Sequence, residues 1–315
     1  MSDQASFLDA DGVEISYRHW RAVGTQRAAV VVAHGASEHS CRYDRFADVL
    51  ANGGYTVLAP DHRGHGRTAA STGPGLTGPR GLAGILDDLD QVVGMASTAV
   101  RGAPVALFGH SMGSIFALRC AQRNPSALSA LILSGPIGVM PGVDDMIAGL
   151  QSALGAGMGD ATVDALTPFN AAFEPARTPF DWLSRDESEV DAYIADPLCG
   201  DGVPLSYGYV YAMSEALRDG ARDVSALAGT VPVLFLAGER DAVSNFTAQA
   251  RELASLMRAA GVEVTEKYYP GARHEVLNEI NRDEVHADVI RWLNALHLPR
   301  SSVGANDRIR RSVGR

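Results

Sequence analysis

The sequence contains few cysteines, and their spacing fits neither a disulfide framework nor a zinc site. Cys41, Cys120 and Cys199 are far apart and odd in number, whereas both kinds of structure require paired or clustered cysteines. A small domain stabilised by disulfides and a zinc-finger protein are therefore excluded. We expect free, buried thiols instead.

Positive charge is also scarce. The chain has 27 Lys and Arg residues against 37 Asp and Glu residues, a formal net charge of -10, and Lys267 is its only lysine. A protein this acidic repels the phosphate backbone of nucleic acids. We therefore expect no nucleic-acid partner.

Long apolar runs are absent as well. No stretch reaches the ~18 uninterrupted apolar residues of a membrane-spanning helix, and Met1 to Gly12 lacks the basic and apolar regions of a signal peptide. We expect a cytoplasmic protein that meets membranes, if at all, only at their surface. Transient contact with a membrane surface through the cap segment at 136–228, described below, stays an open alternative, and the sequence does not define the oligomeric state.

Apolar strand patterns alternate with helical patterns over most of the 315 residues. After a short hairpin at 6–8 and 13–17, apolar runs predict strands at 28–33, 55–59, 105–108, 128–133, 233–237 and 262–269. Helices are predicted at 42–51, 85–100, 112–122, 246–260 and 283–296. Such alternation is typical of an α/β fold, in which helices cover both faces of a mostly parallel sheet.

The alternation stops between two of these strands. Residues 136–228, called the insertion below, contain only short helical pieces punctuated by glycine and proline. We expect them to form a helical cap, or lid, on a core made of residues 1–135 and 229–298, followed by a flexible basic tail at 299–315. Ile137 to Met158 is unusually apolar, which favours a cap over an apolar ligand; an ordinary helical subdomain is compatible with the same pattern.

GHSMG at 109–113 has the form G-x-S-x-G and lies directly between a buried strand and a helix. In this setting the turn exposes the serine oxygen, and the flanking glycines avoid collisions with neighbouring backbone. The free N–H groups at the start of the helix favour developing negative charge. Ser111 is therefore the predicted nucleophile.

A serine nucleophile requires a base and an acid that orients the base. In folds of this kind they follow in the order Ser, Asp or Glu, His, each after a later strand. Asp241 and His274 occupy these places. Glu239 is the alternative acid, and His286 and His297 are alternative histidines on or after the last helix.

The remaining requirement is a pair of backbone N–H groups for the oxyanion. We expect one from Met112, after the nucleophile, and the other from Ala36 in the loop after an early strand. His34, in the same loop, is expected to brace it by hydrogen bonds. DHRGHG at 61–66 is interpreted as a second bracing network rather than a metal site, and G-x-G-x-x-G at 73–78 neither leaves a strand nor opens a helix, so no dinucleotide site is predicted.

Taken together, these motifs resemble the α/β-hydrolase superfamily and, within it, the monoacylglycerol lipase and lysophospholipase-like branch. The resemblance covers roughly residues 5–297 and is carried by HGASEHS at 34–40, DHRGHGR at 61–67, GHSMG at 109–113, DPL at 196–198 and PGARHEVLNE at 270–279. It implies an α/β-hydrolase fold with an inserted helical cap and hydrolysis of a fatty-acyl ester through a serine acyl-enzyme, without cofactor or metal.

The resemblance also assigns roles to residues. It implies that Ser111, Asp241 and His274 form the catalytic triad, that Ala36 and Met112 form the oxyanion hole, and that Glu38 and His39 lie near the polar glycerol end of the site. His34, Gly35 and His110 are further candidates for substrate contact. The chain departs from the family pattern at Ser37 and Ser114, where glycine is common, and at 69–84, which lacks the usual basic loop.

The sequence therefore predicts a serine hydrolase that acts on a small-molecule acyl ester, a monoacylglycerol or a lysophospholipid. A small-ester carboxylesterase or an aminopeptidase on the same scaffold is the alternative. An aminopeptidase needs acidic cap residues for the substrate amine, which Asp186, Glu187, Glu189 and Asp191 could supply. A binding protein that keeps the fold without catalysis is a remote third alternative.

Overall fold

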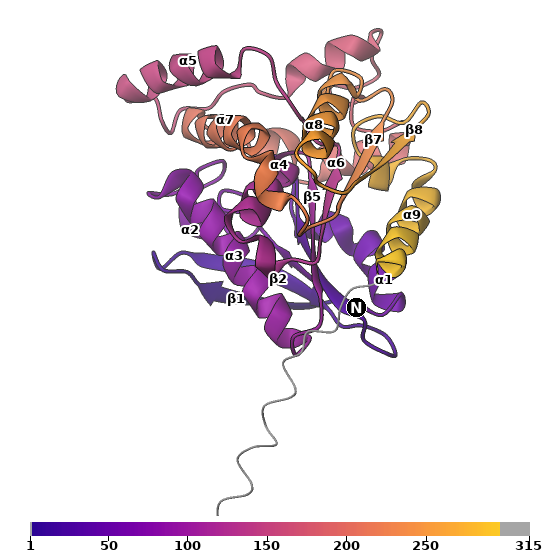
Figure 1. Cartoon of the computed structure of the whole chain (residues 1–315). Helices are drawn as coiled ribbons and strands as arrows, with labels where there is room; N and C mark the ends of the chain where they lie inside the picture. Colours follow the sequence, from indigo (N-terminus) through magenta and orange to yellow (C-terminus); the bar gives the residue numbers. More distant parts are fainter. Residues whose placement is uncertain (1, 297–315) are drawn as a thin grey trace, which may run out of the picture.

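The computed structural model describes residues 2–296 (Figure 1); the predicted basic tail at 299–315 lies outside these residues. Over the described chain, eight strands form one sheet in the order β1-β2-β4-β3-β5-β6-β7-β8. β1 and β2 pair antiparallel and β2 joins β4 antiparallel, whereas β3 to β8 are mutually parallel. The strands span Asp3–Leu8 (β1), Glu14–Trp20 (β2), Ala28–Ala33 (β3), Tyr55–Pro60 (β4), Val105–His110 (β5), Ala130–Ser134 (β6), Val233–Gly238 (β7) and Val264–Tyr269 (β8).

Helices cover both faces of this sheet, as the unbroken apolar strands predict. Alternate residues of β3 belong to two separate cores: Val31 lies in the core that includes residues of α3, α4 and α8, whereas Val30 and Val32 lie in the core that includes residues of α1 and α9. The α-helices span Asp44–Asn52 (α1), Ala69–Thr72 (α2), Gly81–Ala99 (α3), Met112–Arg123 (α4), Val143–Gly155 (α5), Glu187–Ala195 (α6), Tyr207–Arg222 (α7), Ala248–Ala259 (α8) and Arg282–Ala295 (α9). The expected mostly parallel sheet with helices on both faces is confirmed.

The chain between β6 and β7 forms α5, α6 and α7 together with short 3-10 turns, and within the described residues it adds no strand to the sheet. α7 packs against α3 and α4 of the core and against α5. Figure 1 shows α5 and α7 gathered over one end of the sheet. That this insertion acts as a cap stays a prediction.

Candidate active site

Ser111 lies in a strained turn between β5 and α4, with φ +50° and ψ -119°. Side chains at the neighbouring glycines have no room there. A Cβ on Gly109 would lie 2.3 Å from the Gly113 carbonyl oxygen, and a Cβ on Gly113 would lie 2.2 Å from that of Ala33. The two glycines of G-x-S-x-G therefore let α4 approach β3 and β5 closely enough to form the turn.

Asp241 and His274 lie in contact after β7 and β8. The Nδ1 of His274 is 2.9 Å from the Oδ1 of Asp241, and both side chains are buried. The Asp241 carboxylate also accepts hydrogen bonds from the Val243 N–H and the Ser244 hydroxyl. When Nδ1 donates to Asp241, Nε2 is left without a proton and is available as a base. The Nε2 of His274 has no hydrogen-bond partner among the described residues.

The electrostatics of this pair favour the imidazolium form of His274 and the carboxylate form of Asp241. Burial disfavours the imidazolium, but the carboxylates of Asp241, Glu275 and Glu38, with Asp241 the largest contributor among them, together raise the pKa of His274 above its ordinary value. Burial also opposes ionisation of Asp241, yet His274 and the hydrogen bonds from Val243 and Ser244 lower the pKa of this carboxyl. An imidazolium formed by proton transfer to His274 is thus stabilised where it forms.

Ser111 is close to this pair but is not hydrogen-bonded to His274 among the described contacts. A Cβ on Gly35 would lie 3.4 Å from the Ser111 Cβ and 3.1 Å from the His110 ring, and the ring centroids of His110 and His274 are 4.8 Å apart. His110, the residue before Ser111, therefore packs its ring against that of His274 and brings the two segments into contact. Burial and the neighbouring His274 lower the pKa of His110 to about 4, so His110 is neutral near pH 7.

Ser111 and Ala36 line the same apolar cavity of about 360 Å³. Met112 is the first residue of α4, and the first N–H groups of a helix have no partner within it. The two expected oxyanion donors thus belong to segments that meet at Ser111. The remaining walls are Ile115, Ile137, Met140, Met146, Leu150, Val163, Asp164, Ala165, Leu166, Phe169, Trp182, Leu205, Val210, Met213, Ser214, Leu217 and Val243.

Trp182, in the insertion, is a site residue that the sequence analysis missed. Its ring lines the cavity and lies 5.3 Å from the His274 ring, centroid to centroid. Its carbonyl accepts a hydrogen bond from the His274 N–H at 3.3 Å, and the Leu183 carbonyl accepts one from the Glu275 N–H at 2.8 Å. The insertion therefore holds the backbone of the histidine loop. No motif surrounds Trp182 in the sequence, so only the fold reveals this contact.

The other expected contact residues brace the loop after β3. The Nδ1 of His34 bonds the Gly35 carbonyl at 2.7 Å, and its Nε2 accepts from the His62 N–H at 2.9 Å. Glu38 accepts from the Gly35 N–H and the Tyr43 hydroxyl. None of His34, Gly35 and Glu38 lines the cavity that Ser111 opens into.

Glu38 belongs to a buried ionic cluster beside the site, another feature the sequence did not reveal. Arg42 bonds Glu38 at 2.7 Å and Glu275 at 2.5 Å and 2.8 Å. Burial favours the neutral acid, but the Arg42 guanidinium, together with His110, His34 and the Tyr43 hydroxyl, lowers the pKa of Glu38 to about 2. The space that Glu38, Arg42, Glu275 and His110 enclose is about 10 Å³, close to the volume that one water requires.

His39 does not line the cavity and instead contacts Asp196 of the insertion. Its Nε2 lies 2.9 Å from the Oδ2 of Asp196. Ser37, where glycine is common in the family, has φ +54°, and its hydroxyl bonds the Val203 carbonyl at 2.8 Å. This serine therefore occupies a backbone conformation suited to glycine while tying the loop to the insertion. Cys41 corrects one expectation, since its thiol is free but exposed, whereas Cys120 and Cys199 are free and buried.

A serine in a strained strand–helix turn, followed by a buried Asp–His pair after later strands of a mostly parallel sheet, defines a serine hydrolase of the α/β-hydrolase class. Residues 24–281 match the model of the family described as serine aminopeptidase, S33, and the chain belongs to this family.

Known relatives bear out the expected lipase-like branch. The chain is 33% identical over 289 residues to a monoacylglycerol lipase of Mycolicibacterium smegmatis, covering 91% of this chain and 95% of the relative. It is 32% identical over 279 residues to human monoglyceride lipase, covering 88% and 85%. The crystal structure of a thermostable carboxyl esterase from Bacillus coagulans in complex with glycerol superposes with a TM-score of 0.87 at 27% identity, covering 94% of this chain and 98% of that one. The predicted monoacylglycerol lipase-like hydrolase is confirmed.

Within the described part of the chain, no helix has both the length and the apolar character needed to cross a membrane.

Proposed function

We propose that this protein hydrolyses single-chain fatty-acyl esters, monoacylglycerols or lysophospholipids, through an acyl-enzyme on Ser111. The observation that carries the proposal is that Ser111 opens into an apolar cavity of about 360 Å³ beside the buried Asp241–His274 pair. An acyl chain requires apolar walls next to the nucleophile, and a cavity of this size lies within the usual range for ligand sites.

The reaction proceeds in two halves. Ser111 Oγ attacks the ester carbonyl carbon while His274 Nε2 takes its proton, and the imidazolium is stabilised by Asp241. The N–H groups of Ala36 and Met112 stabilise the oxyanion. His274 then returns the proton to the alcohol oxygen as the ester C–O bond breaks. Water, deprotonated by His274, attacks the acyl-enzyme, and departure of the fatty acid restores the Ser111 hydroxyl.

The insertion serves in this proposal as the cap over the acyl chain. Met146 and Leu150 of α5 and Met213 and Leu217 of α7 line the cavity opposite the strand ends. Trp182 covers His274 with an apolar ring. By excluding water, these side chains strengthen the electrostatic interactions at the reacting carbonyl.

Three carboxylates of the acidic run that would favour an aminopeptidase form ion pairs with arginines. Asp186 caps α6 and pairs with Arg282 at 2.6 Å. Glu189 pairs with Arg45 at 2.8 Å, and Asp191 pairs with Arg177 at 2.7 Å. None of these carboxylates lines the cavity at Ser111. The run at 186–191 therefore offers no carboxylate for a substrate amine. Asp164 of the insertion does line the cavity, but its Oδ1 accepts hydrogen bonds from the Leu166 and Thr167 N–H groups, so we favour an ester over an amine-bearing peptide as the substrate.

The test is hydrolysis of a panel containing monoacylglycerols, a lysophospholipid, short p-nitrophenyl esters and an aminoacyl amide, with wild type and Ser111→Ala in parallel. We expect cleavage of the single-chain lipids and a loss of at least ~10³-fold in the variant. Preference for the short esters or the amide would contradict the lipid assignment. Equal turnover by both proteins would contradict the role of Ser111.

The proposal includes a cytoplasmic location and transient contact of the insertion with lipid surfaces. Met158, Ile194 and Leu198 of the insertion are 40%, 46% and 37% exposed. Changing these three to serine should lower the fraction of protein that floats with phosphatidylcholine vesicles. Leu8→Ser, at a residue 68% exposed on β1, is the control. An equal loss in this control would show non-specific adhesion.

A further inference from the structure

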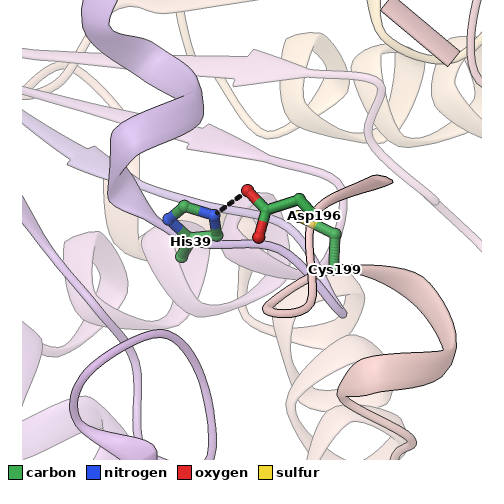
Figure 2. Close-up of side chains that lie close together, drawn as sticks. All are labelled: His39, Asp196 and Cys199. Carbon is green, nitrogen blue, oxygen red and sulfur yellow. Dashed lines mark hydrogen bonds and ion pairs between the residues drawn. The ribbon is translucent and has the colours of Figure 1, made fainter. Parts of the chain in front are cut away.

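Three potential metal ligands meet where the insertion contacts the core. His39 lies in the loop after β3, and Asp196 and Cys199 follow α6 (Figure 2). The ring nitrogen of His39, a carboxylate oxygen of Asp196 and the thiol of Cys199 all lie within 4.8 Å of one another. No sequence motif marks this cluster, because the histidine is 157 residues from the aspartate.

The turn that carries Asp196 and Cys199 fixes their orientation. The Leu198 N–H donates to Oδ1 of Asp196 at 2.9 Å, and the Cys199 N–H donates to the Asp196 carbonyl at 3.0 Å. Because Oδ1 is held by the backbone, Oδ2 is the oxygen that faces His39, as Figure 2 shows. The Asp-x-x-Cys turn therefore presents one carboxylate oxygen and one sulfur on the same side.

The same turn is anchored to the histidine loop by backbone contacts. The Gly200 N–H donates to the Ser37 carbonyl at 2.9 Å, and the Ser37 hydroxyl donates to the Val203 carbonyl at 2.8 Å. These bonds bring the two segments together without requiring a metal. Ligands from the core and from the insertion are thus held near one another in advance, which lowers the ordering cost of binding.

The donor set and its burial fit a particular class of ion. His39 is 5% and Cys199 3% exposed, whereas the Asp196 side chain is 33% exposed and gives solvent access to one side. Imidazole, thiolate and carboxylate together suit zinc, which bonds them at about 2.0–2.3 Å in a tetrahedron. Ligand atoms in such a tetrahedron are about 3.3–3.7 Å apart. Because the three atoms already lie within 4.8 Å of one another, side-chain movements of roughly 1 Å would bring them to this spacing.

We propose that His39 Nε2, Asp196 Oδ2 and Cys199 Sγ form a binding site for a thiophilic divalent cation, Zn²⁺ in the first place, with water as the fourth ligand. Binding releases the protons that His39 and Cys199 carry, since both bind metals in their deprotonated forms. The ion would join the insertion to the loop that contains Ala36, next to Ser37. The site takes no part in the ester-hydrolysis mechanism, so either proposal can fail without the other.

The test is titration of the full chain, free of any affinity tag, with Co²⁺ and then Zn²⁺. Co²⁺ bound by a thiolate gives a charge-transfer band in the near ultraviolet that carboxylate or imidazole ligands alone do not give. We expect one equivalent of Co²⁺ to produce this band and one equivalent of Zn²⁺ to abolish it. Cys199→Ser should remove the band, and Asp196→Asn should weaken binding by at least about 100-fold, more than loss of an outer-sphere partner usually costs.

Two other cysteines supply matched controls. Cys120 is buried in α4 and hydrogen-bonds Asp90 at 2.8 Å, so Cys120→Ser should keep the band. Cys41 is exposed and also contacts His39, and Cys41→Ser should keep the band too. Zn²⁺ should raise the unfolding temperature of wild type and of both controls, but not of Cys199→Ser, because only a ligand of the folded state stabilises it.

Any of three results would overturn the proposal: no thiolate band in the wild type, a band that persists in Cys199→Ser, or a band that Cys41→Ser alone removes. Should Cys199→Ser fail to fold, as judged by its circular dichroism, Asp196→Asn at the part-exposed position decides the matter. Unchanged metal affinity in that variant would then show that His39 and Asp196 form an ion pair and nothing more.

Discussion

The ends of the core strands and the insertion contribute different things to the site. Ser111, Asp241 and His274 follow β5, β7 and β8 and bring its polar chemistry, whereas the insertion brings apolar walls such as Leu150 and Met213. Positions in the first region are fixed by backbone sterics and buried hydrogen bonds. Those in the second are fixed by packing, which tolerates exchange among apolar side chains. Substitutions at the strand ends should therefore change the rate of the chemical steps, whereas substitutions in the insertion should change which acyl chains are accepted.

The largest effect should come from the strand ends. Asp241→Asn keeps the shape of the side chain but removes the charge that holds His274 in its catalytic tautomer and stabilises its imidazolium. We expect kcat to fall by about 10⁴-fold with little change in KM, measured on the best monoacylglycerol of the panel.

Asp223→Asn is the control for this change. Asp223 is 54% exposed and pairs with Arg119 at the surface, so its loss should leave kcat unaltered. A fall of less than 10-fold in Asp241→Asn, with the fold intact, would mean that another group orients His274.

The second prediction compares a glycine in each region. Ala at Gly113 would place its Cβ 2.2 Å from the Ala33 carbonyl oxygen, so α4 must move away from β3. We expect Gly113→Ala to lower the free energy of unfolding by about 3 kcal/mol or more, the upper end for overpacking. Denaturant unfolding measures this loss.

Gly149 lies in α5, where a Cβ would meet nothing within 4 Å, and its backbone is helical. Gly149→Ala should raise the free energy of unfolding by about 0.5–1 kcal/mol, because alanine favours the helix. Similar losses in both variants would show that the two regions are equally constrained, contrary to the comparison.

The sequence could predict site residues at the strand ends but not those of the insertion. The triad candidates could be named for two reasons. A strained serine needs flanking glycines, and apolar runs such as Val233–Gly238 mark the strands after which the acid and the histidine are expected. The cavity walls could not, since any apolar helix residue fits the pattern and only packing selects those that face Ser111. The hold of Trp182 on the His274 loop is a backbone contact between distant segments, which leaves no local signature.

Element boundaries show a similar limit. The helix expected from Ile85 begins at Gly81, because its first turn contains two glycines and lacks the apolar periodicity used to predict it. The acidic run at 186–191 is compatible with binding an amine, but its pattern favours a solvated helix face. The structure pairs its carboxylates with Arg45, Arg177 and Arg282, which supports the solvated helix face.

The third prediction alters the insertion without touching the chemistry. Met146→Trp should fill part of the cavity that Met146 lines, so long acyl chains lose more than short ones. We expect the ratio of kcat/KM for long-chain over short-chain esters to fall roughly 10-fold, the lower end for one misfitting group in an apolar pocket.

Met158→Trp is the matched control, since Met158 belongs to the same insertion but is 40% exposed and does not line the cavity. Its chain-length ratio should match that of wild type. If Met146→Trp instead lowered kcat/KM equally for every chain length, the insertion would act on the chemistry itself and not on the choice of acyl chain.

The smallest effect concerns pH. In the proposed mechanism, His274 must be neutral to accept the Ser111 proton. Burial lowers its pKa, but Asp241, with smaller contributions from Glu275 and Glu38, raises it above the ordinary value of 6.5. Because the folded-state pKa is raised, the inactive imidazolium persists to a higher pH, and the acid limb of kcat/KM should have its midpoint above pH 6.5. Asp241→Asn removes the largest raising charge while burial remains, so the midpoint for its residual activity should move to lower pH. An acid limb that stays in place in this variant would assign the titration to a group other than His274, and the strand ends would then not hold the titrating base.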